Sequence, residues 1–346
     1  MTVMSAEPAI SGTPAALADS RPAVAARLRQ AVDLLPEPAR ALAAYHFGWQ
    51  APDGTPLSGG PGKMLRPVLA LEAAHAVGAD RDVALPGAVA VELVHNSSLL
   101  KDDVADGDTT RRHRPTTWTM FGEDEAILAS DALLVLATTV LIDQAPSHGP
   151  AALRELANAY QELVRGQIMD LRFQNLQQVS VTECCQMAAG KTAALMSCAT
   201  RIGAILAGAP AEPILALAAF GWQIGLSFQF IDDILGIWGD PAQTGKPVGS
   251  DIFAKKKSLP VAYALAQPTD DVAELREFYA AETSPTAGDV AWATCILTQL
   301  GAREWAEQRA ADHYLLAQRS LACDGLSADR QSGLRALAEY ATRCIQ

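Results

Sequence analysis

The sequence predicts an all-α fold, a single large helical bundle around a deep central cavity. Three observations support this class. Segments rich in alanine and leucine repeat with the three-to-four spacing of a helix face along most of the chain. Aromatic residues make up only 6% of the 346 residues, which favours closely packed helices over a β-sandwich. The alternating runs and hairpin turns that indicate strands are absent from the sequence.

The helical pattern begins at about residue 22 and continues to the end of the chain. Clusters of glycine and proline separate its segments, for example at 52–54, 59–62, 146–150 and 208–210. We expect helices over residues 23–35, 38–50, 64–78, 82–105, 123–145, 150–175, 181–207, 211–239, 257–267, 270–281, 287–317 and 326–345. Residues 1–21, rich in Ala, Pro, Ser and Thr, predict a disordered tail, and residues 22–346 one all-α domain.

Composition excludes some classes of function. Hydrophobic residues form 49% of the chain and charged residues 19%, so a sizeable core is expected. The net charge of −12, with no long basic stretch, argues against nucleic-acid binding. The six cysteines lack zinc-site spacing. No run approaches the ~18 apolar residues of a membrane span, so we expect no transmembrane segment and a cytoplasmic protein.

Two acidic clusters lie beside strongly apolar segments. The first contains Asp102, Asp103 and Asp106, and the second contains Asp232 and Asp233. Carboxylates in such surroundings repel one another and resist desolvation, so they need a counter-charge. Mg²⁺ typically binds a few carboxylates together with substrate phosphates. The clusters therefore predict two metal-binding walls facing one cavity, with a diphosphate between them.

The spacing within each cluster refines this prediction. Asp102 and Asp106 are four residues apart, so they share one helical face about 6 Å apart along the axis. In the second cluster, Gly236 stands where the corresponding acid is expected, and Asp240 lies further along a similar face. A single copy of this pattern is also typical of a solvated helix face. Two copies, each followed by basic residues, favour the metal site.

Basic residues accompany both clusters. A glycine-rich loop at 59–62 leads into Lys63 and Arg66, where backbone N–H groups and two cations suit a phosphate, although an exposed loop is the alternative. His95 lies two helical turns before Asp102. The guanidinium groups of Arg111 and Arg112 suit bidentate binding of oxyanions. Further cations are Lys191, Lys246 and the run 255–257, which alone is typical of a solvated surface.

These residues resemble the trans-type polyprenyl diphosphate synthases, the family that includes farnesyl and geranylgeranyl diphosphate synthases. The resemblance runs from about residue 59 to residue 260, and residue types, order and spacing agree. It rests on Gly62-Lys63-x-x-Arg66-Pro67, His95, Asp102-Asp103-x-x-Asp106-x4-Arg111-Arg112-x-x-Pro115-Thr116, Gly166-Gln167-x-x-Asp170-Leu171, Lys191-Thr192, Phe228-Gln229-x-x-Asp232-Asp233, Gly245-Lys246 and Lys256.

The resemblance implies a role for each matching residue. Asp102, Asp106 and Asp232 would ligate three Mg²⁺ ions, with Asp103 and Asp233 in supporting roles. Thr192 and Gln229 would place polar oxygens near a developing carbocation. Arg111, Lys191, Lys246 and Lys256 would hold the allylic diphosphate, and Lys63, Arg66, His95 and Arg112 would hold isopentenyl diphosphate. The resemblance also implies a homodimer.

Product length is expected to depend on the cavity floor, one turn before Asp102. In the family, an aromatic residue at this level blocks growth at the C15 product. Ser97 and Ser98 occupy it here. Two small residues favour geranylgeranyl diphosphate, the C20 product.

Four positions depart from the family pattern: Gly236, His113 in place of glycine, Met64 in place of arginine, and Lys101 in place of a neutral or imidazole side chain. They leave two alternatives open. A class I terpene cyclase on the same scaffold would ionise one allylic substrate and need no second diphosphate site. A non-catalytic subunit that tunes product length would be expected to lose acids of the first cluster, and all of those are present.

Overall fold

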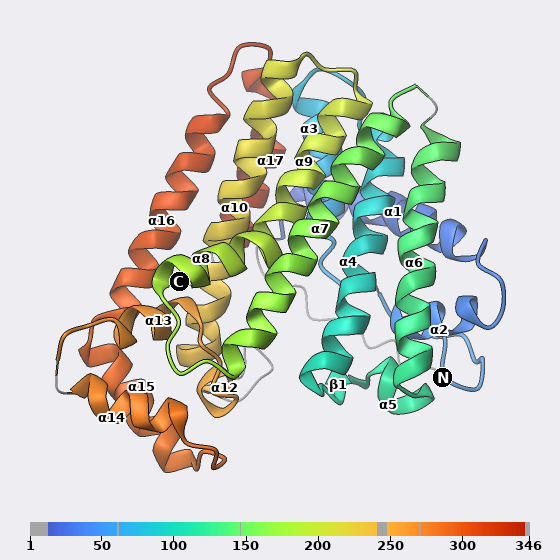
Figure 1. Cartoon of the computed structure of the whole chain (residues 1–346). Coiled ribbons are helices and arrows are strands. Elements are labelled where there is room, and N and C mark those ends of the chain that lie inside the picture. The colour runs from blue at the N-terminus through green and yellow to red at the C-terminus, as the bar shows by residue number, and fades with distance from the viewer. Residues whose placement is uncertain (1–12, 61, 146, 241–247, 270, 343–346) are drawn as a thin grey trace, which may run out of the picture. The chain divides into compact units, whose positions relative to one another are not determined.

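The computed structural model confirms the all-α prediction (Figure 1). It describes residues 13–60, 62–145, 147–240, 248–269 and 271–342. Within those residues the only strands are two short ones, β1 (Thr110–Arg111) and β2 (Arg114–Pro115), which pair antiparallel. Almost every expected helix is present within a few residues of its predicted bounds.

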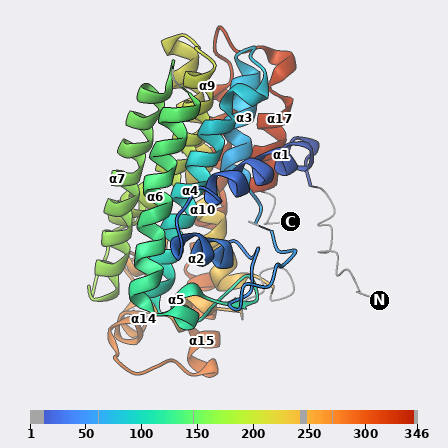
Figure 2. The same cartoon turned by 90° about the vertical axis from the view of Figure 1, so that its right-hand side faces the viewer.

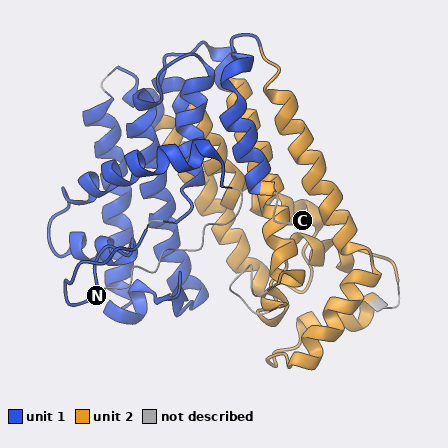
Figure 3. Ribbon diagram, turned by 180° about the vertical axis from the view of Figure 1, so that it is seen from behind, with its two compact units in different colours: residues 1–153, 202–214, 324–341 blue, residues 154–201, 215–323, 342–346 orange. Residues whose placement is uncertain are grey.

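The residues predicted as one domain divide into two compact units (Figure 3). Unit 1 consists of residues 1–153, 202–214 and 324–341, and unit 2 of residues 154–201, 215–323 and 342–346. The first acidic cluster therefore belongs to unit 1 and the second to unit 2.

Unit 1 is built mainly from the N-terminal helices. Its elements are α1 (Ala15–Val32), α2 (Ala39–His46), α3 (Leu65–Ala76), the 3-10 turn η1 (Arg81–Ala84), α4 (Leu85–Asp106), β1, β2, α5 (Thr117–Phe121), α6 (Glu123–Gln144), the 3-10 turn η3 (Ala328–Arg330) and most of α17 (Ser332–Thr342).

Unit 2 is built from the later helices. It holds most of α7 (Gly149–Gln174), α8 (Val181–Ala188), the π-helical turn η2 (Ala189–Ala193), most of α9 (Ala194–Leu206) and α10 (Ala211–Trp238), and α12 (Ser250–Phe253), α13 (Leu259–Leu265), α14 (Asp271–Ala280), α15 (Ala287–Gln299) and α16 (Ala302–Ser320).

The N-terminal boundary of the fold lies earlier than predicted. Helix α1 begins at Ala15, and its side chains Leu17 and Val24 are buried. The predicted tail over residues 1–21 is therefore wrong for residues 15–21, and residues 1–12 lie outside the described residues. Pro22 marked a boundary in the sequence, but burial of Leu17 on the same face as Val24 extends the helix through it.

Helix α4 carries the first acidic cluster through the core of unit 1. It packs against α1, α3 and α6, and Figures 1 and 2 both show α4 and α6 side by side. Leu93, Val94 and Leu100 are buried along it. The core thus fixes the direction of α4 up to its last turn, where the acids lie.

Three helical stretches have the length and hydropathy of a membrane span: Arg81–Asp106, Glu123–Gln144 and Ala211–Trp238. The expectation that no run approaches such a span was therefore wrong on hydropathy. In these stretches 72%, 44% and 56% of the most apolar window, respectively, is buried inside the structure, so core packing accounts for part of this composition.

Candidate active site

The first acidic cluster occupies the C-terminal end of α4. The helix stops at Asp106 because Gly107 follows in the left-handed region, with φ of 69°. Asp106 is exposed and Asp102 is half-buried, whereas Asp103 is almost completely buried. The two acids of the predicted i, i+4 pair thus share a face that solvent reaches, and Asp103 points into the protein.

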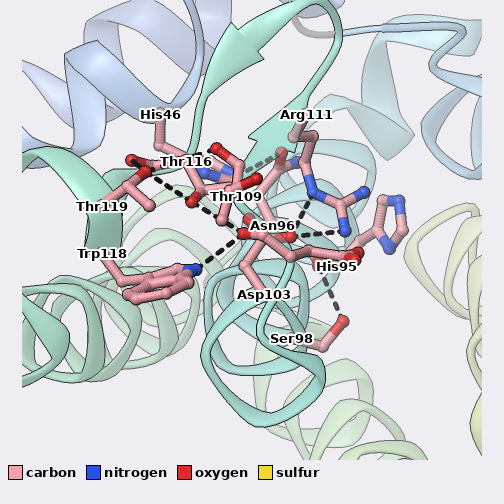
Figure 4. Close-up of polar contacts among 11 residues, drawn as sticks. His46, His95, Asn96, Ser98, Asp103, Thr109, Arg111, Thr116, Trp118 and Thr119 are labelled. Carbon is pink, nitrogen blue, oxygen red and sulfur yellow. Dashed lines mark hydrogen bonds and ion pairs between the residues drawn. The ribbon is translucent and has the colours of Figure 1, made fainter. Parts of the chain in front are cut away.

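Asp103 is paired with Arg111 from the hairpin (Figure 4). Arg111 Nε and Nη2 lie 2.7 and 2.6 Å from Asp103 Oδ1. Burial raises the pKa of Asp103, while Arg111 opposes this rise. Asp103 Oδ2 is buried without a hydrogen-bond partner among the described residues. Arg111 and Asp103 therefore form an ion pair in which Asp103 Oδ1 is engaged and Asp103 Oδ2 can still accept a hydrogen bond.

The turn between β1 and β2 places the paired arginines. Arg112 and His113 both adopt positive φ, 51° and 60°, between the paired residues Arg111 and Arg114. Two-residue hairpin loops favour positive φ at both central residues, which glycine and asparagine adopt most readily. This turn was not predicted, because neither residue carries the usual turn signal.

The cations expected to hold isopentenyl diphosphate gather in unit 1. Arg66 Nη1 on α3 lies 3.3 Å from His95 Nε2 on α4. A Cβ built on Gly62 would lie 2.9 Å from Arg112 Nη2, so Arg112 packs on the glycine-rich loop. Burial lowers the pKa of His95 well below its ordinary value, and Arg66 and Arg112 act in the same direction. Lys63 follows this loop and is exposed.

A buried acid lies beneath these cations. Glu92 on α4 is 2% exposed, and burial raises its pKa to about 7 despite the opposing effects of Asn96, Arg66 and Arg112. Asn96 Nδ2 donates to Glu92 Oε1 over 2.9 Å, and His46 Nε2 lies 3.2 Å from Asn96 Oδ1. Sequence reasoning missed these three residues, although polar groups one turn apart in an apolar helix are a usable signal.

The second acidic cluster, in unit 2, repeats the pattern of one outward and one inward acid. Asp232 on α10 is exposed, whereas Asp233 is 1% exposed. Asp233 Oδ1 accepts from Gln229 Nε2 over 2.8 Å, and Oδ2 accepts from Leu259 N over 2.9 Å. Burial raises the pKa of Asp233 to about 7, against the effect of Lys256. Both Asp233 oxygens are thus engaged within the protein.

A π-helical turn presents two further predicted residues. Thr192 lies in η2, and its Oγ1 donates to Gln229 Oε1 over 2.5 Å. Lys191, in the same turn, donates to Asp170 Oδ2 over 2.6 Å. Single π-helical turns often occur at functional sites. The π-helical turn packs closely against Gly166 on α7. A Cβ at Gly166 would lie 2.3 Å from Lys191 N, so only glycine allows this approach.

The remaining predicted residues of unit 2 have mixed outcomes. Lys256 Nζ lies 3.9 Å from Asp251 Oδ2. Burial lowers the pKa of Lys256, but the charges of Asp233 and Asp251 outweigh this effect, so its pKa is raised overall. Lys257 is buried and donates to Phe173 O, so the lysine run is not simply a solvated surface. Lys246 lies outside the described residues, and Asp240 is exposed.

The donor set suits a magnesium ion that shares its ligands with a substrate. Among the described residues, no three His, Cys, Asp or Glu side chains form a preformed metal cage. Mg²⁺ does not require one, since it binds through one or two carboxylates plus phosphates and water. The half-buried Asp102, the exposed Asp106 and Asp103 Oδ2, which has no hydrogen-bond partner among the described residues, meet that requirement.

Comparison with known proteins decides the family. The polyprenyl synthetase family model matches residues 55–296. The chain belongs to the polyprenyl synthetase family. It is 45% identical over 316 residues to a (2E,6E)-farnesyl diphosphate synthase of Mycobacterium tuberculosis, covering 90% of this chain and 88% of that one. It is 42% identical over 291 residues to a geranylgeranyl diphosphate synthase of the same organism, covering 84% and 83%.

Solved structures agree with this assignment. A polyprenyl synthetase from Streptomyces coelicolor A3(2) matches with a TM-score of 0.91 and 41% identity, over 94% of this chain and 98% of that one. A geranylgeranyl pyrophosphate synthase from Corynebacterium glutamicum, complexed with isoprenyl diphosphate and magnesium, matches with a TM-score of 0.78 and 28% identity, over 95% and 99%. The chain is thus a trans-prenyltransferase, and neither the cyclase nor the non-catalytic subunit is favoured.

The departures from the polyprenyl synthetase pattern now have local explanations. His113 occupies a left-handed position, which is why glycine is usual there. Lys101 Nζ donates to Asp131 Oδ1 on α6 over 2.8 Å, so an acid balances its charge. Met64 precedes α3 in the left-handed region and is buried.

Proposed function

We propose that this synthase condenses isopentenyl diphosphate with an allylic diphosphate in a Mg²⁺-dependent reaction, and that its product is geranylgeranyl diphosphate. One observation carries the proposal. Arg66, His95 and Arg112 gather beside the first acidic cluster in the same unit. A second diphosphate site next to a metal wall serves chain elongation, whereas a cyclase needs only one such site.

Three magnesium ions per site would be held by Asp102, Asp106 and Asp232, with Asp103 and Asp233 in support. When bound, Mg²⁺ neutralises the charge that develops on the leaving diphosphate. Asp233 acts indirectly, since its contacts with Gln229 and Leu259 fix the turn of α10 that presents Asp232. Asp103 fixes Arg111 in the same way.

The chain's own residues carry the remaining steps. Arg111, Lys191, Lys246 and Lys256 hold the allylic diphosphate and stabilise its charge as the C–O bond breaks. Lys63, Arg66, His95 and Arg112 hold isopentenyl diphosphate so that its double bond faces the allylic cation. A C–C bond then forms, and a proton passes to the departing diphosphate. The lone pairs of the Thr192 hydroxyl face the developing positive charge.

The C20 product is supported by small residues below the first cluster. Ser97 is fully buried, and its Oγ lies 2.8 Å from Ser130 Oγ on α6. Ser98 is also buried, and its hydroxyl donates to His95 O. Small side chains on both α4 and α6 favour a floor deeper than that of a C15 synthase. The relatives include both product classes, so length is decided by measurement.

A homodimer is supported by an apolar stripe on α6. Leu128, Val135 and Ile142 lie seven residues apart and are 65%, 64% and 55% exposed. Such contiguous exposed apolar side chains mark interaction surfaces. Val135→Asp should convert the dimer to a monomer in sedimentation experiments. Val83→Asp, at another exposed apolar position, should leave it dimeric.

Site variants test the catalytic proposal. Asp102→Ala and Asp232→Ala should each reduce turnover at least ~10³-fold, since removing one strong transition-state contact costs about that much. Asp143→Asn, which removes an exposed acid near the far end of α6, is the matched control and should retain activity. Arg66→Gln should raise the KM for isopentenyl diphosphate more than that for the allylic substrate. Full activity in Asp102→Ala would overturn the metal assignment.

A further inference from the structure

Gly236, the missing acid of the second cluster, has an unusual neighbour. A Cβ built on Gly236 would lie 2.4 Å from Asp251 Cγ and 2.3 and 2.8 Å from its two carboxylate oxygens. A side chain at position 236 fits only if the Asp251 carboxylate moves away. The carboxylate of Asp251, on the short helix α12, therefore occupies the space in which a side chain at position 236 would begin.

The two oxygens lie at distances close to those of an aspartate's own carboxylate, although Asp251 Cγ lies 2.4 Å from the built Cβ and not at the roughly 1.5 Å of a bonded carbon. In an aspartate, standard bond lengths place both carboxylate oxygens roughly 2.4 Å from Cβ. Asp251 thus holds its two oxygens about as far from the expected Cβ of residue 236 as an aspartate at that position would. The acid comes from another element of the same unit but reaches the same point of α10.

That point lies on the face of α10 that carries the metal-binding acid. Position 236 is four residues after Asp232, so the two share a helical face one turn apart. Asp102 and Asp106 of the first cluster have the same spacing. Asp251 therefore completes in unit 2 the i, i+4 pair that the sequence of α10 lacks.

We propose that Asp251 supplies the third carboxylate of the second acidic cluster and, with Asp232, holds magnesium on the allylic diphosphate. This rests on the proposed function. Asp251 is 17% exposed at its side chain, so solvent and ions reach it. Lys256 Nζ lies 3.9 Å from Asp251 Oδ2 and balances the charge of this carboxylate near position 236. One side-chain contact, from Ser250 Oγ to Gly236 O over 3.4 Å, joins α12 to α10.

The alternative is a purely structural ion pair between Asp251 and Lys256. The two roles differ in what restores function. A structural pair requires an acid at position 251. A metal-binding role requires a carboxylate at this point of the site, whichever residue supplies it. Moving the acid back to α10 therefore separates them.

The experiment compares four variants at positions 236 and 251, together with Asp232→Ala, with the unmodified protein. Asp251→Asn and Asp251→Ala remove the acid. Gly236→Asp combined with Asp251→Ala transfers it to α10, and Gly236→Ala combined with Asp251→Ala fills the space without charge. The readout is the Mg²⁺ concentration that gives half of the rise in melting temperature at a fixed concentration of inorganic diphosphate. Melting temperatures without Mg²⁺ show that each variant is folded.

Both single variants should need at least ~10-fold more Mg²⁺, the usual cost of losing a residue that supports a metal site. The variant with the transferred acid should recover most of this loss, and the double alanine variant should not. An unchanged Mg²⁺ requirement in Asp251→Asn, or equal behaviour of the two double variants, would overturn the proposal. Asp232→Ala distinguishes a failure of this inference from a failure of the proposed metal site. If it loses the response while Asp251→Asn keeps it, only this inference fails. If the unmodified protein shows no response, the proposed metal site itself fails.

Discussion

Gln229 Nε2 donates a hydrogen bond to Asp233 Oδ1 over 2.8 Å, one turn later on α10. Gln229 Oε1 in turn accepts from Thr192 Oγ1 in the π-helical turn. The amide therefore fixes both the Thr192 hydroxyl and the buried carboxylate of Asp233, which follows Asp232. Because all three residues are buried, each relies on these partners in place of water.

Replacing this amide should therefore cost stability and activity together. Gln229→Leu leaves Asp233 Oδ1 and Thr192 Oγ1 without their partner, a loss of about 1–3 kcal/mol in the free energy of unfolding. Turnover should fall at least ~10-fold because Thr192 and α10 lose their orientation. Denaturant unfolding and steady-state rates measure the two effects. Gln223→Leu on the same helix is a control for stability, since it breaks only the contact with His313.

The buried acid Glu92 should make stability depend on pH. Its pKa rises from 4.5 to about 7 on folding, so the folded protein holds a proton that the unfolded chain releases. The free energy of unfolding should then fall as pH rises from 4.5 to 7, by on the order of 3 kcal/mol from this group. Glu92→Gln should match the unmodified protein at pH 5 and exceed it at pH 8. Equal stability of the two proteins at pH 8 would contradict the assigned shift.

A larger side chain at the floor should shorten the product. Ser97→Phe places a ring against Ser130, and combining it with Ser130→Ala relieves part of the resulting overpacking. The product of the double variant should shift from C20 towards C15, as read by mass spectrometry. Ser97→Ala is the control and should keep the product length. A folded double variant with unchanged product would place the floor elsewhere.

His113 should carry a small conformational cost. At φ of 60° an ordinary residue loses roughly 1–2 kcal/mol, whereas glycine loses part of this as backbone entropy. His113→Gly should therefore raise stability by about 0.5–1 kcal/mol in chemical denaturation. Glu282→Gly, at an exposed loop position without positive φ, should not raise it.

Helix periodicity was enough to predict most of the fold. The segments 123–145 and 211–239 match α6 and α10 to within a residue, because both are long, apolar and bounded by glycine or proline. The split between α15 and α16 was missed, since the helical pattern continues across Gly301, which adopts φ of 70°. The hairpin at Arg111–Arg114 was missed because its turn lacks glycine.

The positions of the site residues along the chain were predictable, but their orientations were not. Asp102 and Asp103 are adjacent residues of the same type, so the sequence does not say which one is buried. In the structure Asp103 lies on the buried face of α4 and pairs with Arg111, whereas Asp102 is half-buried. Asp251 could not be linked to Gly236 from spacing, since the two residues are fifteen positions apart in the sequence and lie on different helices. Such side-chain partnerships depend on tertiary packing rather than on local pattern.

Product analysis with purified protein, Mg²⁺ and an allylic diphosphate tests the central claim most directly. The reaction is run with and without isopentenyl diphosphate, and products are separated by chain length. We expect a longer prenyl diphosphate, with C20 predominant, only when isopentenyl diphosphate is present. A hydrocarbon or alcohol formed from the allylic substrate alone, or no product under either condition, would contradict the proposed chain elongation.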